Sequence, residues 1–143
     1  MRLLAILFVG LVLAAAGTAH SRAAPAGPAG PLPGLTGAWR VVTLDGAPPP
    51  GRTGVTMDFA PGGRLSGQAP CNRYHAGYRI EGNRIIFSPG ATTRMFCGEE
   101  IMSAEQRLME MLGGGAEWSL SDENLTLAAD SGVTVTATRT HAR

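Results

Sequence analysis

The chain contains no lysine, so all twelve of its basic residues are arginines. Arg2 lies in the N-terminal segment, and without it the remaining eleven arginines balance eleven acidic residues. A formally neutral chain with no clustered basic stripe has no long-range field that attracts nucleic acid. We therefore expect no nucleic-acid partner.

Long apolar runs are equally scarce. The longest, Leu3–Ala16, is shorter than the roughly 20 residues that a membrane-spanning helix needs. Arg2 precedes it and small residues up to Ala19 follow it, which is typical of a cleaved signal peptide. We expect residues 1–19 to be this signal, with Ala23 as an alternative cleavage site and an uncleaved anchor as the other interpretation. The mature chain would then have no transmembrane segment and would be periplasmic or secreted.

The next segment, residues 20–34, consists mainly of proline, glycine and alanine. Such a segment cannot bury enough apolar area to offset its ordering entropy, so we predict a flexible linker. Residues 35–140 have the size of one ordinary domain with a single core. Residues 141–143 are expected to be a short C-terminal tail.

Alternation with a period of two dominates the domain and predicts short strands joined by hairpins. Turn signals such as Glu81-Gly82-Asn83 separate the alternating segments. In Ala38–Leu44 we expect Trp39, Val41 and Thr43 to share one face. The expected strand segments are 38–44, 55–59, 65–69, 74–80, 84–88, 118–120, 125–129 and 133–137.

One helical interruption is predicted from about Glu99 to Leu112, where apolar residues fall three and four positions apart. Ser103 with Gln106 also fits a capping box, so a start as late as Ala104 is an alternative. An amphipathic helix among antiparallel strands must pack on the sheet or plug the mouth of a barrel. The expected fold is mainly β: a curved antiparallel sheet or partly closed barrel of about 7–8 strands, with one α-helix packed on it.

The chain has only two cysteines, Cys71 and Cys97. In an exported protein two cysteines predict one disulfide, because the compartment is oxidising. The bond would close a loop of roughly 25 residues and stabilise the domain by about 3 to 4 kcal/mol in the chain-entropy model.

Two other interpretations of the cysteines are open. Cys71 is a candidate nucleophile with His75 as its base, although in an extended strand their Cα atoms lie roughly 13 Å apart. Together with Cys97 these residues also supply three soft ligands, one fewer than a structural zinc site normally has. We expect no catalytic residue, no metal and no cofactor.

Four blocks of the sequence, in this order, carry a family resemblance. They are Leu35-Thr36-Gly37-Ala38-Trp39, Cys71-Asn72-Arg73-Tyr74, Thr92-Thr93-Arg94-Met95-Phe96-Cys97 and Glu105-Gln106-Arg107-Leu108. With these blocks the chain resembles the META domain of HslJ-like bacterial envelope proteins over nearly the whole domain. The resemblance implies a small antiparallel β structure with one helix, a role in heat-shock response or antibiotic tolerance, and no established catalytic machinery.

The candidate binding surface flanks the expected disulfide. It consists of Asn72, Arg73, Tyr74, His75, Arg94 and Phe96. The alternative interpretation is that the arginines are solvated surface cations, that Tyr74 lies at the edge of the core and that Asn72 bonds local backbone in its turn. We expect four methionines either to line an apolar groove beside the helix or to fill the core. They are Met95, Met102, Met109 and Met111.

Three classes of function follow. The leading class is a monomeric, non-catalytic envelope module for stress tolerance that binds an unknown protein or a small hydrophobic ligand. An apolar cavity beneath the helix would support this class. The second is an inhibitor or accessory module for an extracellular enzyme or secretion component. An exposed loop at Arg94-Met95-Phe96 would support this class. The third is a thiol-dependent enzyme, which needs free thiols.

Overall fold

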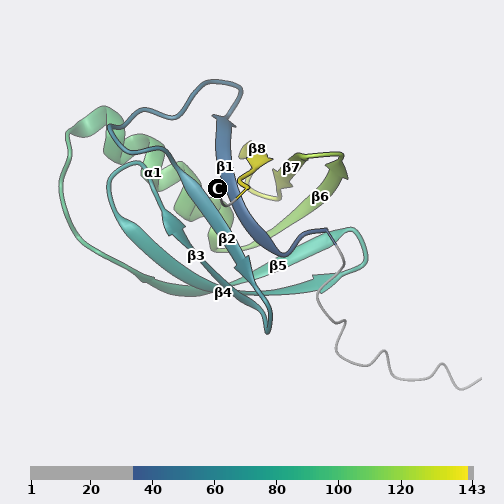
Figure 1. Ribbon diagram of the computed structural model, residues 1–143. Coiled ribbons are helices and arrows are strands. Elements are labelled where there is room, and N and C mark those ends of the chain that lie inside the picture. Colours follow the sequence, from purple (N-terminus) through teal and green to yellow (C-terminus); the bar gives the residue numbers. More distant parts are fainter. Residues whose placement is uncertain (1–33, 142–143) are drawn as a thin grey trace, which may run out of the picture.

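The alternating segments form eight antiparallel strands in the computed structural model of the chain, which describes residues 34–141. The strands are β1 (Gly37–Leu44), β2 (Thr56–Ala60), β3 (Arg64–Gln68), β4 (Arg73–Glu81), β5 (Arg84–Thr92), β6 (Gly115–Ser121), β7 (Asn124–Ala129) and β8 (Thr134–Arg139). Each strand pairs with its neighbour in sequence, and β8 returns to pair with β1, so the sheet closes into a barrel (Figure 1). The prediction of a mainly β fold with one helix is confirmed.

The predicted signal peptide and all but the last residue of the predicted linker lie outside the described residues. Within residues 34–141, no helix combines the length and the apolar composition needed to cross a membrane.

The helix α1 (Glu99–Leu112) has the predicted bounds. It begins directly after Gly98, which has a φ of 101°, and Gln106 donates to Glu110 on the next turn. The alternative start at Ala104 is therefore wrong. The buried side chains of α1 join the core cluster at the end of the barrel where β1 ends and β4 begins. They include Leu108, Met111 and Leu112.

Strand β5 is longer than predicted. It pairs with β4 as far as Thr92 but with β6 only over Arg84–Ile86. Beyond Ile86 the outer edge of β5 has no strand beside it, and α1 contacts both β5 and β6 at this gap. The helix therefore closes the part of the barrel wall that the sheet leaves open.

Strand β1 departs from the predicted alternation in its second half. Trp39 and Val41 are buried as expected, but Leu44 is buried in place of Thr43. The register of β1 against β8 shifts between Val41 and Thr43, and such a bulge reverses the face on which the following residues lie. The Thr43 hydroxyl instead lies 2.6 Å from that of Thr136 on β8.

The opposite end of the barrel is closed by the chain entering β1. Leu35 and Trp39 are fully buried there, and the Trp39 indole donates to the carbonyl of Leu35 at 2.9 Å. The Arg139 guanidinium lies 4.2 Å from the Trp39 ring centroid and donates to the carbonyls of Gly34 and Thr36. A cation over an indole face combines electrostatic attraction with shielding of the ring from water.

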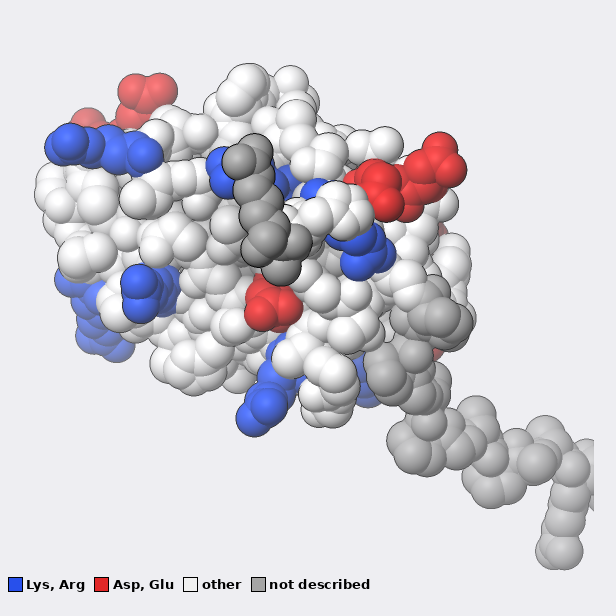
Figure 2. Space-filling view, in the orientation of Figure 1, with Lys and Arg blue, Asp and Glu red and all other residues white. Residues whose placement is uncertain are grey.

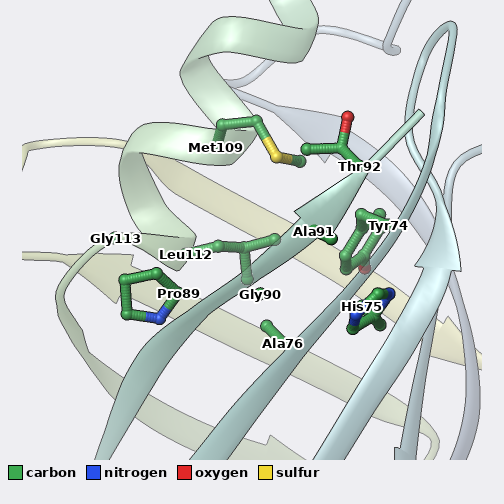
Figure 3. A pocket seen from close by; sticks show the side chains of 10 residues that line it. All are labelled: Tyr74, His75, Ala76, Pro89, Gly90, Ala91, Thr92, Met109, Leu112 and Gly113. Carbon is green, nitrogen blue, oxygen red and sulfur yellow. The ribbon is translucent and has the colours of Figure 1, made fainter. Parts of the chain in front are cut away.

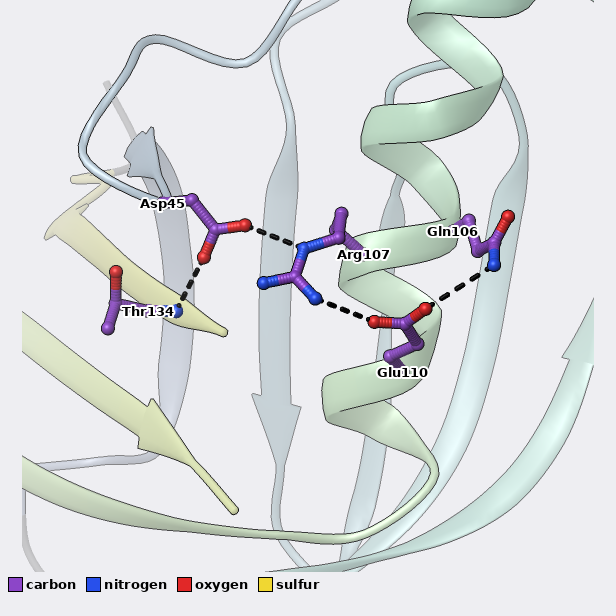
Figure 4. Close-up of polar contacts among 5 residues, drawn as sticks. All are labelled: Asp45, Gln106, Arg107, Glu110 and Thr134. Atoms are coloured by element: carbon purple, nitrogen blue, oxygen red, sulfur yellow. Dashed lines mark hydrogen bonds and ion pairs between the residues drawn. The ribbon is translucent and has the colours of Figure 1, made fainter. Parts of the chain in front are cut away.

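An ionic network joins α1 to the end of β1 (Figure 4). Arg107 donates from Nε to Asp45 and from Nη1 to Glu110, both at 2.8 Å, and the Thr134 N–H donates to Asp45 at 3.0 Å. The hydrogen bond from Arg107, assisted by that from Thr134, holds the pKa of Asp45 below its usual value. Partial burial acts in the opposite direction and does not reverse the shift.

The lowered pKa of Asp45 predicts an acid-side loss of stability. The stabilisation is present above the unfolded pKa of about 4 and disappears as the pH falls through the lower native pKa. Asp45→Asn should therefore lower the free energy of unfolding at pH 7 and flatten its decrease toward pH 2. Asparagine tolerates the left-handed φ of 51° at this position. Urea unfolding across this pH range measures the effect. Asp58→Asn, an exposed change on β2, serves as the control, and an equal flattening in both variants would contradict the assignment.

Candidate functional site

The carboxylate of Glu105 bonds the turn that precedes β4. Its Oε2 accepts the backbone N–H groups of Cys71 at 2.8 Å and Asn72 at 2.7 Å, and its Oε1 accepts the Asn72 side-chain amide. Only 5% of Glu105 is exposed. Two buried backbone donors outside any strand would otherwise lack a partner, and one carboxylate satisfies both.

Sequence reasoning missed Glu105, although a signal for it exists. Glu105 lies at helical spacings of three, four and seven from Leu108, Ile101 and Leu112, all apolar residues. A carboxylate inside an apolar stripe indicates a buried partner, because an unpaired buried charge is too costly to keep. The spacing alone does not identify which donor it meets.

Asn72 links this turn to the segment that precedes the helix. Its Oδ1 accepts the Met95 N–H at 2.7 Å and the Thr93 hydroxyl at 2.8 Å, and its Nδ2 donates to the Met95 carbonyl at 3.1 Å. The expected bond to local backbone is therefore wrong. The Asn72 side chain turns inward, is 1% exposed, and bonds residues more than twenty positions away in the sequence.

The disulfide between Cys71 and Cys97 is confirmed, with the two Cα atoms 5.8 Å apart. Neither cysteine is free, so the thiolate nucleophile at Cys71 and the zinc site built on both thiols are wrong. Cys71 is buried and Cys97 is exposed. Across residues 34–141, no group of three or more His, Cys, Asp or Glu side chains is placed to hold a metal ion.

The segment 93–98, called the Phe96 loop, presents apolar side chains to solvent. Phe96 is 76% exposed and Met95 is 56% exposed, and among the described residues the other exposed large hydrophobic side chain is Val42 on β1. The Asn72 bonds and the disulfide hold the loop from beneath. An exposed aromatic on a preordered loop loses little conformational entropy when it binds.

A groove of about 510 Å³, called the Phe96 groove, lies between this loop and the outer face of α1. Its lining consists of Phe96, Glu99, Met102, Ser103, Glu105, Gln106 and Met109. Two of the four methionines named above therefore line it. Met95 is exposed on the loop, and Met111 is buried in the core.

A second, smaller cavity of about 200 Å³ lies under the C-terminal half of α1, where the edge of β5 is open (Figure 3). From the helix, Met109 and Leu112 reach toward the start of β4 and the end of β5. The other lining residues are Tyr74, His75, Ala76, Pro89, Gly90, Ala91, Thr92 and Gly113. Met109 lines both hollows, so they adjoin along one side of the helix.

The structure divides the predicted binding surface into buried and exposed parts. Asn72 and Tyr74 are interior residues, and Tyr74 donates its hydroxyl to the Thr56 carbonyl at 2.9 Å. Burial raises the pKa of Tyr74 well above its usual value, so this hydroxyl stays neutral. These two side chains support the surface and do not form part of it.

The other four predicted residues are exposed but do not meet in one hollow. Phe96 lines the groove, whereas Arg73 and His75 line a separate shallow cleft between the start of β4 and the end of β5. Arg94 lines neither the Phe96 groove nor that cleft. The exposed apolar residue and the exposed cations therefore belong to neighbouring but distinct surfaces.

The fold and site define a closed, eight-stranded antiparallel barrel with one helix across its end and an apolar groove on that helix. A family model described as the META domain matches residues 33–142. The chain therefore belongs to the META domain family.

Solved structures share the fold. One protein structure determined by NMR has a TM-score of 0.62 and 24% sequence identity, over 72% of this chain and 88% of that chain. A second NMR structure, of a protein from Burkholderia xenovorans, has a TM-score of 0.59 and 20% identity, over 74% of this chain and 83% of that chain. At these identities the likeness shows the fold alone. No curated protein matches the chain significantly.

The buried carboxylate generates a stability prediction. In Glu105→Gln one carboxylate oxygen becomes an NH₂ group, which must face either the two backbone donors or the Asn72 amide. Asn72 cannot flip to compensate, because its Oδ1 already accepts from Met95 and Thr93. We expect a loss of about 1 to 3 kcal/mol in the free energy of unfolding, measured by urea denaturation.

Glu100→Gln is the matched control for this change. Glu100 is exposed in the first turn of the same helix, so its substitution should cost less than about 0.5 kcal/mol. Equal losses in the two variants would show that helix charge, and not the contact with Cys71 and Asn72, sets the stability.

Proposed function

We propose that this META-domain protein is a non-catalytic binding module of the bacterial cell envelope and that the Phe96 groove is its binding site. The observation that carries the proposal is an apolar loop held in an exposed position beside an open, methionine-lined groove. Exposed apolar surface costs solubility, so a rigid exposed patch of this kind indicates an interaction site.

The volume and lining of the groove support this choice. Ligand sites are commonly hollows of about 300 to 1,000 Å³ with mostly apolar walls and a few polar groups. The Phe96 groove has a volume in this range, and Met102 and Met109 are flexible side chains that adapt to ligands of different shape. A small hydrophobic ligand of the envelope fits such a site.

The N-terminal segment and the disulfide support a location outside the cytoplasm. The signal-like N-terminal segment supports export to the periplasm or the medium. The disulfide agrees with an oxidising compartment. A role in stress tolerance is proposed from the resemblance to HslJ-like proteins.

One observation favours a second candidate, an inhibitor or accessory module for an extracellular enzyme or secretion component. Arg94, Met95 and Phe96 are consecutive and all exposed on the preordered loop. Arginine and aromatic side chains are enriched among the residues that dominate protein interfaces. In this function the loop would enter a partner's cleft, and the groove would remain at the rim of the interface.

A neutral apolar probe tests the leading function. N-phenyl-1-naphthylamine should bind the protein saturably with one site, and its fluorescence should rise in the apolar groove. Phe96→Ala removes one wall of the groove and should weaken binding by about tenfold, as expected for losing most of one aromatic contact.

Val42→Ala is the control, because Val42 is also an exposed apolar residue but lies on β1 and does not line the groove. It should leave the affinity unchanged. Absence of saturable binding would refute the small-ligand function and leave the inhibitor function as the better account. Equal weakening in both variants would show non-specific adsorption.

A further inference from the structure

We propose that the ligand of the Phe96 groove is a cationic amphiphile, that is, an apolar chain or ring carrying one positive charge. This inference rests on the proposed function and adds the chemical class of the ligand. It follows from the signs of the charges in the lining, which are all negative.

Glu99 and Glu105 are the charged residues that line the groove, and no arginine lines it. Arg107 lies on the same helix but donates to Asp45 and Glu110, away from this hollow. Arg73 at the start of β4 lines a different cleft, and the exposed Arg94 on the Phe96 loop does not line the groove. An anionic ligand would thus meet the exposed carboxylate of Glu99 and no arginine in the lining.

The two carboxylates also lack positive partners of their own. Glu105 accepts only from backbone N–H groups and the neutral Asn72 amide, and neither Glu99 nor Glu105 forms an ion pair with any described residue. Glu105 is buried and both of its oxygens are occupied by Cys71 and Asn72, so the charge available to a ligand is that of the exposed Glu99. The open side of the groove places Glu99 in solvent, where a ligand's charged group can remain partly hydrated.

The apolar lining complements the other half of such a ligand. Met102 and Met109 provide a floor for an alkyl chain, and polarisable thioethers pack against irregular shapes. Phe96 adds an aromatic face, which attracts a cation and repels an anion. Both the polar and the apolar parts of the groove thus favour a positive head group on an apolar body.

The surface near the start of α1 carries acidic side chains with arginine side chains directly beside them (Figure 2). In Figure 2 acidic side chains gather at the upper left, where Figure 1 places the start of α1. Arginines gather below them along the left margin, on the side of the long loop between β5 and α1. The acidic region overlies the helix that carries Glu99 and Glu100.

Amphiphiles with the same twelve-carbon tail and different head groups test the inference. The probes are dodecyltrimethylammonium, dodecyl maltoside and dodecyl sulfate, each below its micelle concentration, and binding to the full protein is followed by NMR of the Met102 and Met109 methyl groups. We expect the cationic probe to bind about tenfold more tightly than the neutral one, and the sulfate most weakly.

Glu99→Gln and Glu100→Gln form a matched pair, because both remove one negative charge from the first turn of α1. Glu99 lines the Phe96 groove, whereas Glu100 lines a hollow beside the β1–β2 loop. Glu99→Gln should weaken the cationic probe about fivefold and leave the neutral probe unchanged. Glu100→Gln should change neither.

The outcomes separate the two proposals. If all three probes shift the Met102 and Met109 methyl signals with equal affinity, the groove binds apolar ligands and the charge preference is refuted. If Glu99→Gln and Glu100→Gln weaken the cationic probe equally, the preference comes from the general field of the helix and the inference also fails. If no probe shifts these methyl signals, the groove is not a ligand site and the proposed function fails with the inference.

Discussion

The carboxylate of Glu105 is the contact on which the arrangement of the site depends. It fixes α1 to the turn at Cys71 and Asn72, and Asn72 in turn fixes the loop that carries Phe96. Removing the carboxylate would leave its buried donors unsatisfied, and an unsatisfied buried donor costs about 1 to 3 kcal/mol. The helix, the turn and the loop are therefore held as one unit.

The barrel explains why a helix is needed at this place. Pairing between β5 and β6 stops after three residues. The sheet alone therefore leaves an opening beside the part of β5 that follows Ile86. The apolar side of α1 fills the opening and completes the core. The outer side of the same helix, with Glu99, Met102 and Met109, is left to form the groove. Stability and binding thus use neighbouring faces of one element, because Glu105 and Met109 contribute to both.

Much of the fold could be predicted because its determinants are local. Alternation and turn residues indicated the strands, and spacing with the acidic first turn indicated the bounds of α1. The bulge in β1 could not be predicted, since the register shift after Val41 depends on β8, almost a hundred residues later. The length of β5 was also missed, because its last residues are exposed and carry no apolar alternation.

The candidate site could be predicted only in outline. The cysteine pair and its neighbours marked the right region, and Phe96 proved to be exposed there. The sequence could not show that Asn72 and Tyr74 face inward, because their partners Glu105 and Thr56 are distant in the chain. Side-chain bonds between separate elements depend on tertiary packing and have no periodic signal.

Amide hydrogen exchange at Cys71 and Asn72 tests the central claim most directly. Both amides lie in a turn outside the strands, so without Glu105 they would exchange as fast as an exposed turn amide such as that of Gly62. The account predicts that they are instead protected to the level of the central strands and exchange only through global unfolding. Rapid exchange at both positions in the native protein would show that the carboxylate does not hold the turn and would contradict the account.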